Sequence, residues 1–203
     1  QSHGNDHAQG DRLNRTFAAV GQLLISFWIP GMLVCGLIGS LVLDWWIGDH
    51  MAKLGGPVWA WLSLGILLNG FAHLPYTLLH SAGRSDITAK FHLAELLPYL
   101  VSVAWALTHY GIVGAAAVWS ARCAIDTALL YIAAARLRPD LKRTSLRTAL
   151  WAFGACLVLG LAQGLMGSVQ PAWPENRDAL YLGAAALAWT IWRGRRLKTI
   201  ASK

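Results

Sequence analysis

The sequence predicts an all-α, polytopic membrane protein with six transmembrane helices, and three of its features support this prediction. Of its 203 residues, 56% are hydrophobic and 13% are charged, whereas charged residues make up about 25% of an average soluble domain. The apolar residues form long runs, most of them near the ~20 residues that a helix needs to cross a bilayer. The basic residues fall into alternate loops between these runs. A very hydrophobic soluble helical bundle is the alternative, and the length of the runs argues against it.

The runs define the six helices in order. The first carries Pro30, which should kink it, and is longer than one straight span. The last is short for a full span, so it is expected to begin earlier, near Trp173, or to thin the bilayer locally. The predicted helices cover residues 16–47, 58–80, 88–108, 112–135, 146–169 and 179–192. This divides the chain into a polar segment (1–15), a helical lobe (16–192) and a basic tail (193–203).

The loops agree with this order of helices. Fourteen of the 17 Lys and Arg residues lie in alternate loops or at the termini, whereas the other loops hold only Lys53 and Arg177, and Arg122 lies inside a helix. Under the positive-inside rule, both termini are therefore expected on the cytoplasmic side. Most tryptophans lie near predicted helix ends, as in an aromatic belt. Trp28 and Trp119 do not, and we expect them to be packing or lumen residues.

The same sequence disfavours several classes of function. The net charge of +7 is explained by the basic loops, so nucleic acid is not an expected partner. Cys35, Cys123 and Cys156 lie inside apolar runs without a CxxC spacing, which predicts small core residues and no disulfide framework. No cluster has metal-ligand spacing, and no phosphate-binding loop, nucleophile elbow or HExxH motif occurs. We therefore expect no metal, no cofactor and no enzymatic activity.

Three charged residues fall inside predicted membrane helices. If residues 88–108 and 112–135 form an antiparallel hairpin around Tyr110, Glu95 and Asp126 lie at nearly the same depth, with Arg122 about 4–5 Å nearer the outside. Arg122 and Asp126 are also i, i+4 neighbours on one helix face. One interpretation is a structural clamp that holds the hairpin. The other is a proton or ion site, because one carboxylate remains beyond what Arg122 neutralises.

Asn69 and His73 are a second polar pair, again at i, i+4. Pro75 follows them and leaves the carbonyl of Phe71 without its helical donor. The pair and this carbonyl are expected either to line a polar cavity or to form hydrogen bonds between packed helices. Gly160 and Gly164 form a GxxxG spacing that predicts a close helix contact.

A resemblance to a known family rests on residues 67–131. The features are an Asn and a Pro in one helix and, in order, the segments HSAGRSDITAK, HLAELLPYL, YGIVGAAA and ARCAIDT. Upstream, GDRLNRTF and WWIG fit the same pattern. Together they resemble the oligosaccharide flippases of the multidrug/oligosaccharidyl-lipid/polysaccharide exporter superfamily. The resemblance covers about residues 10–138 well and the last two helices only by pattern.

The resemblance implies one lobe of a two-lobe, twelve-helix transporter in a bacterial inner membrane. Such proteins move O-antigen or exopolysaccharide units on polyprenyl pyrophosphate across the membrane by alternating access. The chain would be the carboxy-terminal lobe, with Asn69 and His73 as cavity candidates and Glu95, Arg122 and Asp126 at charged positions of the family. Because one lobe has no cavity of its own, a missing amino-terminal lobe or a second copy is expected as partner. The absence of a starting Met leads us to expect a fragment.

The alternatives within this fold are a peptidoglycan-precursor flippase and a multidrug or cation antiporter. A different class is a membrane scaffold that does not transport, or a membrane enzyme that acts on polyprenyl lipids. An enzyme of that kind would be expected to carry an acidic or His-rich inner loop for pyrophosphate and metal, and the inner loops here are basic.

Overall fold

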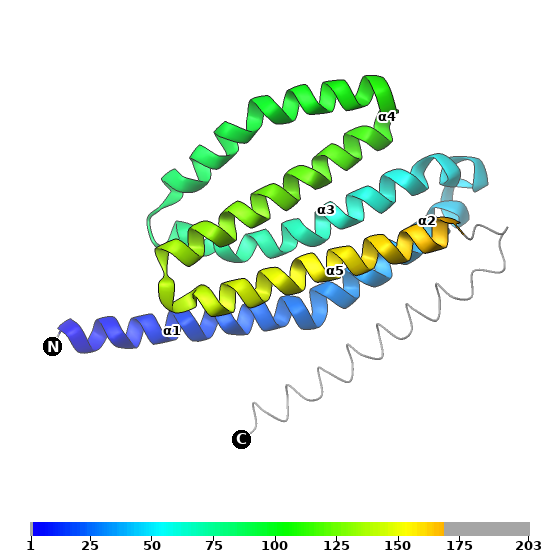
Figure 1. Cartoon of the computed structure of the whole chain (residues 1–203). Coiled ribbons are helices and arrows are strands. Elements are labelled where there is room, and N and C mark those ends of the chain that lie inside the picture. Colours follow the sequence, from blue (N-terminus) through cyan, green and yellow to red (C-terminus); the bar gives the residue numbers. More distant parts are fainter. Residues whose placement is uncertain (1, 169–203) are drawn as a thin grey trace.

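The structure is a computed structural model, and it describes residues 2–168. This part of the chain is entirely helical and contains no strand. Four of its helices are long and apolar enough to cross a membrane. They lie roughly side by side in an elongated bundle (Figure 1). The described part of the chain is therefore all-helical, and its four candidate spans are those of a multi-pass membrane protein. Six helices are not confirmed, because the sixth predicted helix, 179–192, lies outside the described residues, as do the basic tail and Trp173.

The first predicted helix is one continuous rod with a local defect. Helix α1 (Ser2–Leu23) runs through a π-helical turn, η1 (Leu24–Trp28), into α2 (Ile29–Ile47). Pro30 follows this turn directly. Proline has no N–H to donate and its ring collides with the carbonyl four residues earlier, so a widened turn before it accommodates the ring. The helix begins at Ser2, well before the predicted start at residue 16.

The next three predicted spans are also found, and the last two of them form the expected hairpin. Helix α3 (Asp49–Ser81) includes the predicted 58–80 span. Helix α4 (Ser85–Leu137) contains both residues 88–108 and residues 112–135, and its backbone breaks at Gly111, where φ is 63° and ψ is −153°. A side chain at that φ would be strained, so glycine permits the reversal. We call residues 85–110 the first arm of α4 and residues 112–137 the second arm. A 3₁₀ turn, η2 (Pro139–Leu141), leads into α5 (Lys142–Ser168).

The core of the bundle is formed by α1, α2, α3, α5 and the second arm of α4. Phe71, Leu67 and Leu159 are fully buried there. The first arm packs much less: Leu93 is 73% exposed and Leu97 is 71% exposed. In a soluble protein such a run of bare leucines would be an interaction or aggregation surface, but hydrocarbon tails cover it in a bilayer.

Three hydroxyl groups set the register between α3 and the second arm of α4. Ser120 donates to the carbonyl of Trp61 at 2.6 Å, and Thr127 donates to the carbonyl of Leu68 at 3.2 Å. Tyr131 donates to the carbonyl of Phe71 at 3.2 Å. The donors and the acceptors advance together along the two chains, so these segments run parallel. In lipid, where water is absent, such bonds between helices are a main source of specific packing.

Close helix contacts are made by tryptophan rings against glycines. The ring of Trp59 lies against Gly39, Trp119 against Gly65 and Trp28 against Gly70, each so close that a Cβ on the glycine would overlap the ring. Trp28 also donates through Nε1 to the carbonyl of Leu67 at 3.1 Å. Trp28 and Trp119 are thus packing residues. The predicted GxxxG pair is looser, since a Cβ on Gly160 would meet only Leu64 at ordinary contact distance and one on Gly164 would meet nothing within 4 Å.

Candidate functional site

A charged cluster occupies the seam between the two arms of α4. Nε of Arg122, on the second arm, lies 3.4 Å from Oε2 of Glu95 on the first arm. The Arg122 guanidinium carbon also lies 5.2 Å from the centre of the Tyr99 ring, which is within the range of a cation–π contact. The side chain of Glu95 is 12% exposed and that of Arg122 is 32% exposed. The pair is therefore partly buried, with its arginine end the more open.

Asp126 completes the cluster. Its Oδ1 lies 3.7 Å from Nδ1 of His92 on the first arm. Ligand atoms of His92, Glu95 and Asp126 lie within 4.8 Å of one another, so the two carboxylates are close together, as in the cluster that the sequence suggested.

Several oxygens of the cluster are buried and have no hydrogen-bond donor in the described part of the chain. They are both carboxylate oxygens of Glu95 and Oδ1 of Asp126. Asp126 as a whole is only 9% exposed. Burying carboxylates without donors is costly, and in a membrane protein such groups more often have a role than a purely structural origin.

The cluster has one negative charge in excess when His92 is neutral. Two carboxylates face one guanidinium, so one further positive charge would balance them. Protonation of His92 or of a carboxylate supplies that charge. Ligand atoms of His92, Glu95 and Asp126 also lie within 4.8 Å of one another, which is a geometry that could hold a small cation. The guanidinium of Arg122 on Glu95 opposes a divalent ion there, because it already occupies one side of that carboxylate.

Asn69 and His73 lie elsewhere, on the exposed face of α3. Neither side chain forms a hydrogen bond or ion pair in the described residues, although the His73 carbonyl accepts from the Thr77 hydroxyl at 2.8 Å. The carbonyl of Phe71, which Pro75 leaves without a helical donor, faces the opposite way and accepts from the Tyr131 hydroxyl. The three groups therefore do not line one cavity as one interpretation of the sequence had it. The carbonyl serves helix packing, and the two side chains remain on the outer face.

Two residues of these sites were not expected from the sequence. His92 was not among the candidate site residues, yet it meets Asp126 across the hairpin. A signal existed, because His92 and Glu95 are three residues apart and so share a helix face. Tyr131 was not singled out at all. Its position two turns beyond Arg122 on a helix that packs on α3 could have suggested that it reaches the Phe71 carbonyl.

A comparison with known proteins finds one partial relative. Over 110 residues the chain is 36% identical to a protein of Shigella flexneri described as "Putative O-antigen transporter". The match covers 53% of this chain and 26% of that protein, so the chain corresponds to about a quarter of its relative's length. No family model matches the chain, and no solved structure matches it.

Proposed function

We propose that this chain is one lobe of a flippase that moves polyprenyl-pyrophosphate-linked oligosaccharide across the bacterial inner membrane. The partial similarity to an O-antigen transporter supports the substrate class. The helical architecture with four candidate spans supports the membrane setting. In this proposal the lobe works beside a second six-helix lobe, which is either a further part of the same protein or another copy.

The observation that carries the proposal is the polar outer face of α3. Asn69 and His73 are exposed on a helix whose other face is buried in the bundle. A side-chain amide that faces hydrocarbon without a partner loses the hydrogen bonds that it makes in water. This loss costs about 4–8 kcal/mol on cyclohexane scales. This face therefore fits a water-filled cavity or a second lobe far better than it fits lipid. A cavity between two lobes satisfies both requirements.

The charged cluster of α4 has a supporting part in this proposal. It lies on the seam of the hairpin, whereas Asn69 and His73 lie on the outer face of α3. We assign it first to holding the two arms together at a fixed register. Its excess carboxylate also allows a role in ion or proton coupling, which the Glu95→Gln and Glu95→Gln/Arg122→Gln variants distinguish from a clamp.

Complementation tests the proposal. In a bacterium that lacks its O-antigen transporter, the chain would be produced alone or linked to the remaining half of an O-antigen transporter. We expect long-chain lipopolysaccharide, seen as a ladder on a gel, only in the second strain. Absence of the ladder in both strains, with the chain present in the membrane at normal level, would count against the function.

A variant pair then tests the carrying observation. The Asn69→Leu/His73→Leu double variant should reduce the ladder at unchanged protein level, because it makes the cavity wall apolar. The matched Leu93→Ala/Leu97→Ala variant, which alters the exposed face of the first arm of α4, should leave the ladder intact. An intact ladder in the α3 variant would remove this face from the transport path.

A further inference from the structure

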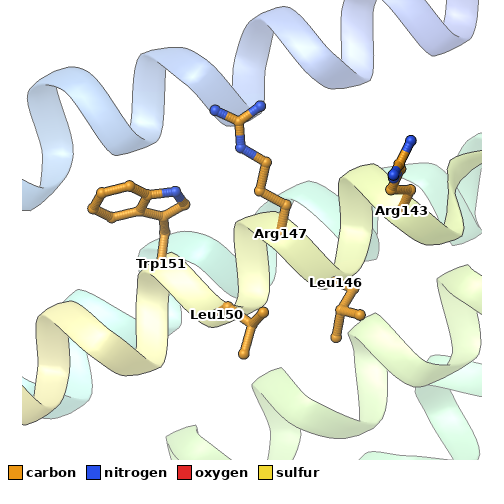
Figure 2. Close-up of a pocket in the computed structure, with 5 residues that line it drawn as sticks. All are labelled: Arg143, Leu146, Arg147, Leu150 and Trp151. Carbon is orange, nitrogen blue, oxygen red and sulfur yellow. The ribbon is translucent and has the colours of Figure 1, made fainter.

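The start of α5 carries a hollow that neither the transport proposal nor the charged cluster explains. It has a volume of about 430 Å³ and is lined by Arg143, Leu146, Arg147, Leu150 and Trp151. Figure 2 shows Arg143, Arg147 and Trp151 on the side of α5 that faces another helix of the bundle, while Leu146 and Leu150 point away from it. A second hollow of about 340 Å³ adjoins the first, shares both arginines and extends to Gln22 of α1.

The two arginines are free to bind an anion. Arg143 and Arg147 are i, i+4 neighbours, so they lie on one face of α5. Neither side chain forms an ion pair or hydrogen bond with residues 12–165, whose side chains the structure describes. The nearest acid in sequence, Asp140, is already held by Arg138 at 2.7 Å and by the side-chain amide of Asn14 at 2.9 Å. The hollow therefore presents two guanidinium groups without a counter-charge in the described structure.

The rest of the lining is apolar and arranged by depth. From Arg143 to Trp151 the helix rises about 12 Å at 1.5 Å per residue. The first half of that distance holds both arginines with Leu146 between them, and the second half holds Leu150 and Trp151. Trp151 is 44% exposed and Leu150 is 64% exposed, so they are open to whatever surrounds the bundle. Charge at one end and an apolar wall with an indole along the rest match the boundary between head groups and acyl chains.

We propose that this hollow binds the phosphate head group of an anionic phospholipid. Arg143 and Arg147 would hold the phosphate, which guanidinium groups bind through paired hydrogen bonds. Leu146, Leu150 and Trp151 would contact the start of the acyl chains. Basic pockets between membrane helices on the cytoplasmic side, where the positive-inside rule places this end of α5, are typical sites for such lipids.

The lining of the hollow distinguishes this ligand from the transport substrate. It consists of two arginines, two leucines and a tryptophan, which suit a phosphate and the start of acyl chains, and it includes neither Asn69 nor His73 of α3. The bound lipid would thus be a resident of the bilayer that anchors α5 against α1.

Lipid binding to the full chain, purified in detergent, tests the proposal by native mass spectrometry. The probes are phosphatidylglycerol, which is anionic, and phosphatidylcholine with the same acyl chains, which has no net charge. We expect the wild-type chain to bind phosphatidylglycerol about 30-fold more tightly, which corresponds to about 2 kcal/mol or about 1 kcal/mol for each arginine. Equal binding of the two lipids would overturn the proposal, and this comparison needs no variant.

Two charge-matched variants locate the site. Arg143→Gln/Arg147→Gln should lose the preference for phosphatidylglycerol. Arg136→Gln/Lys142→Gln removes two positive charges from the same end of the bundle but leaves the hollow intact, so it should keep the preference. If both variants lose it equally, the preference reflects general surface charge and the proposed site is wrong.

A third probe separates the lipid from the transport substrate. Geranylgeranyl pyrophosphate carries a prenyl chain and a pyrophosphate but no glycerol. Arginine-dependent binding of this probe without any binding of phosphatidylglycerol would reassign the hollow to the carrier lipid and overturn the proposal. Binding of phosphatidylglycerol that depends on the two arginines supports it, whether or not the chain transports oligosaccharide.

Discussion

Neutralising Arg122 should destabilise the hairpin by a measurable amount. At 3.4 Å and an effective dielectric constant of about 20, the attraction between Arg122 and Glu95 is about 5 kcal/mol before solvation is counted. The arginine side chain is 32% exposed, so solvent screens part of this attraction. Breaking a fully buried pair costs about 3–5 kcal/mol. For this partly open pair we expect Arg122→Gln to lower the free energy of unfolding by about 2–3 kcal/mol.

Removing the other partner should cost less. Glu95→Gln leaves a guanidinium that is partly exposed and still lies over the ring of Tyr99. We expect a loss of about 1 kcal/mol, because an exposed cation keeps much of its solvation. The Glu95→Gln/Arg122→Gln double variant leaves no unpaired charge in this pair and should lie within about 1 kcal/mol of the wild type. The coupling energy between the two positions would then be about 2–4 kcal/mol.

The assay is reversible unfolding of the purified chain in mixed micelles, followed by circular dichroism as the share of denaturing detergent rises. All four members of the cycle are measured under one condition, so the unfolded state is common to them. Additive losses, with no coupling between Glu95 and Arg122, would refute the assignment of this pair to holding the arms together.

The same four proteins separate a clamp from a transport site in cells that depend on this protein for O-antigen export. We expect Arg122→Gln to abolish export. If the cluster is only a clamp, the double variant should regain export along with stability. If its charges take part in transport, the double variant should stay inactive at normal protein level, and the pH dependence of export should change in Glu95→Gln.

Three further predictions follow from the packing and from the outer face of α3. Tyr131→Phe should lower the free energy of unfolding by about 1 kcal/mol, because the Phe71 carbonyl loses its donor; an unchanged midpoint in the micelle titration would contradict this bond. Gly70→Leu should cost about 1–3 kcal/mol through overlap with the Trp28 ring, whereas Gly154→Leu, which meets nothing within 4 Å, should be nearly neutral in the same titration. In a variant without Cys35, a cysteine at Asn69 or His73 should react with a membrane-impermeant thiol reagent in the assembled transporter, and one at Leu97 should not; equal reaction at all three positions would place α3 outside a cavity.

Helix positions were predictable because the bilayer leaves few choices. Each predicted span of 16–47, 58–80, 88–108, 112–135 and 146–169 overlaps a described helix, since apolar run length alone decides whether a segment can cross. Helix ends were less predictable. The first helix extends back to Ser2 through polar residues, where hydropathy carries no signal.

Side-chain pairing was predictable only in part, because it depends on how the helices tilt and rotate. The sequence showed that Glu95 and Arg122 lie on adjacent antiparallel arms, and they do meet. The pairing of Asp126 with His92 depends on how the arms rotate about the break at Gly111, which the spacing of residues does not determine. Likewise, the sequence exposed the free carbonyl of Phe71, but only the rotation of the second arm of α4 shows that Tyr131 reaches it.

The charged cluster of α4 and the Asn69–His73 pair of α3 lie apart, and this separation limits how ion and substrate could be coupled. Ion coupling by the α4 cluster requires water to reach it, and access is best at Arg122 and at His92, whose side chain is 44% exposed. The route would therefore run along the hairpin seam and not past Asn69 and His73. A transporter that coupled ion and substrate through one shared cavity would place these groups on one wall. Here the two groups belong to different faces, so coupling between them would pass through the packing of α4 on α3. The contacts that could carry it include the three hydroxyl bonds from Ser120, Thr127 and Tyr131 on the second arm and the contact of His80 with Thr88 on the first arm.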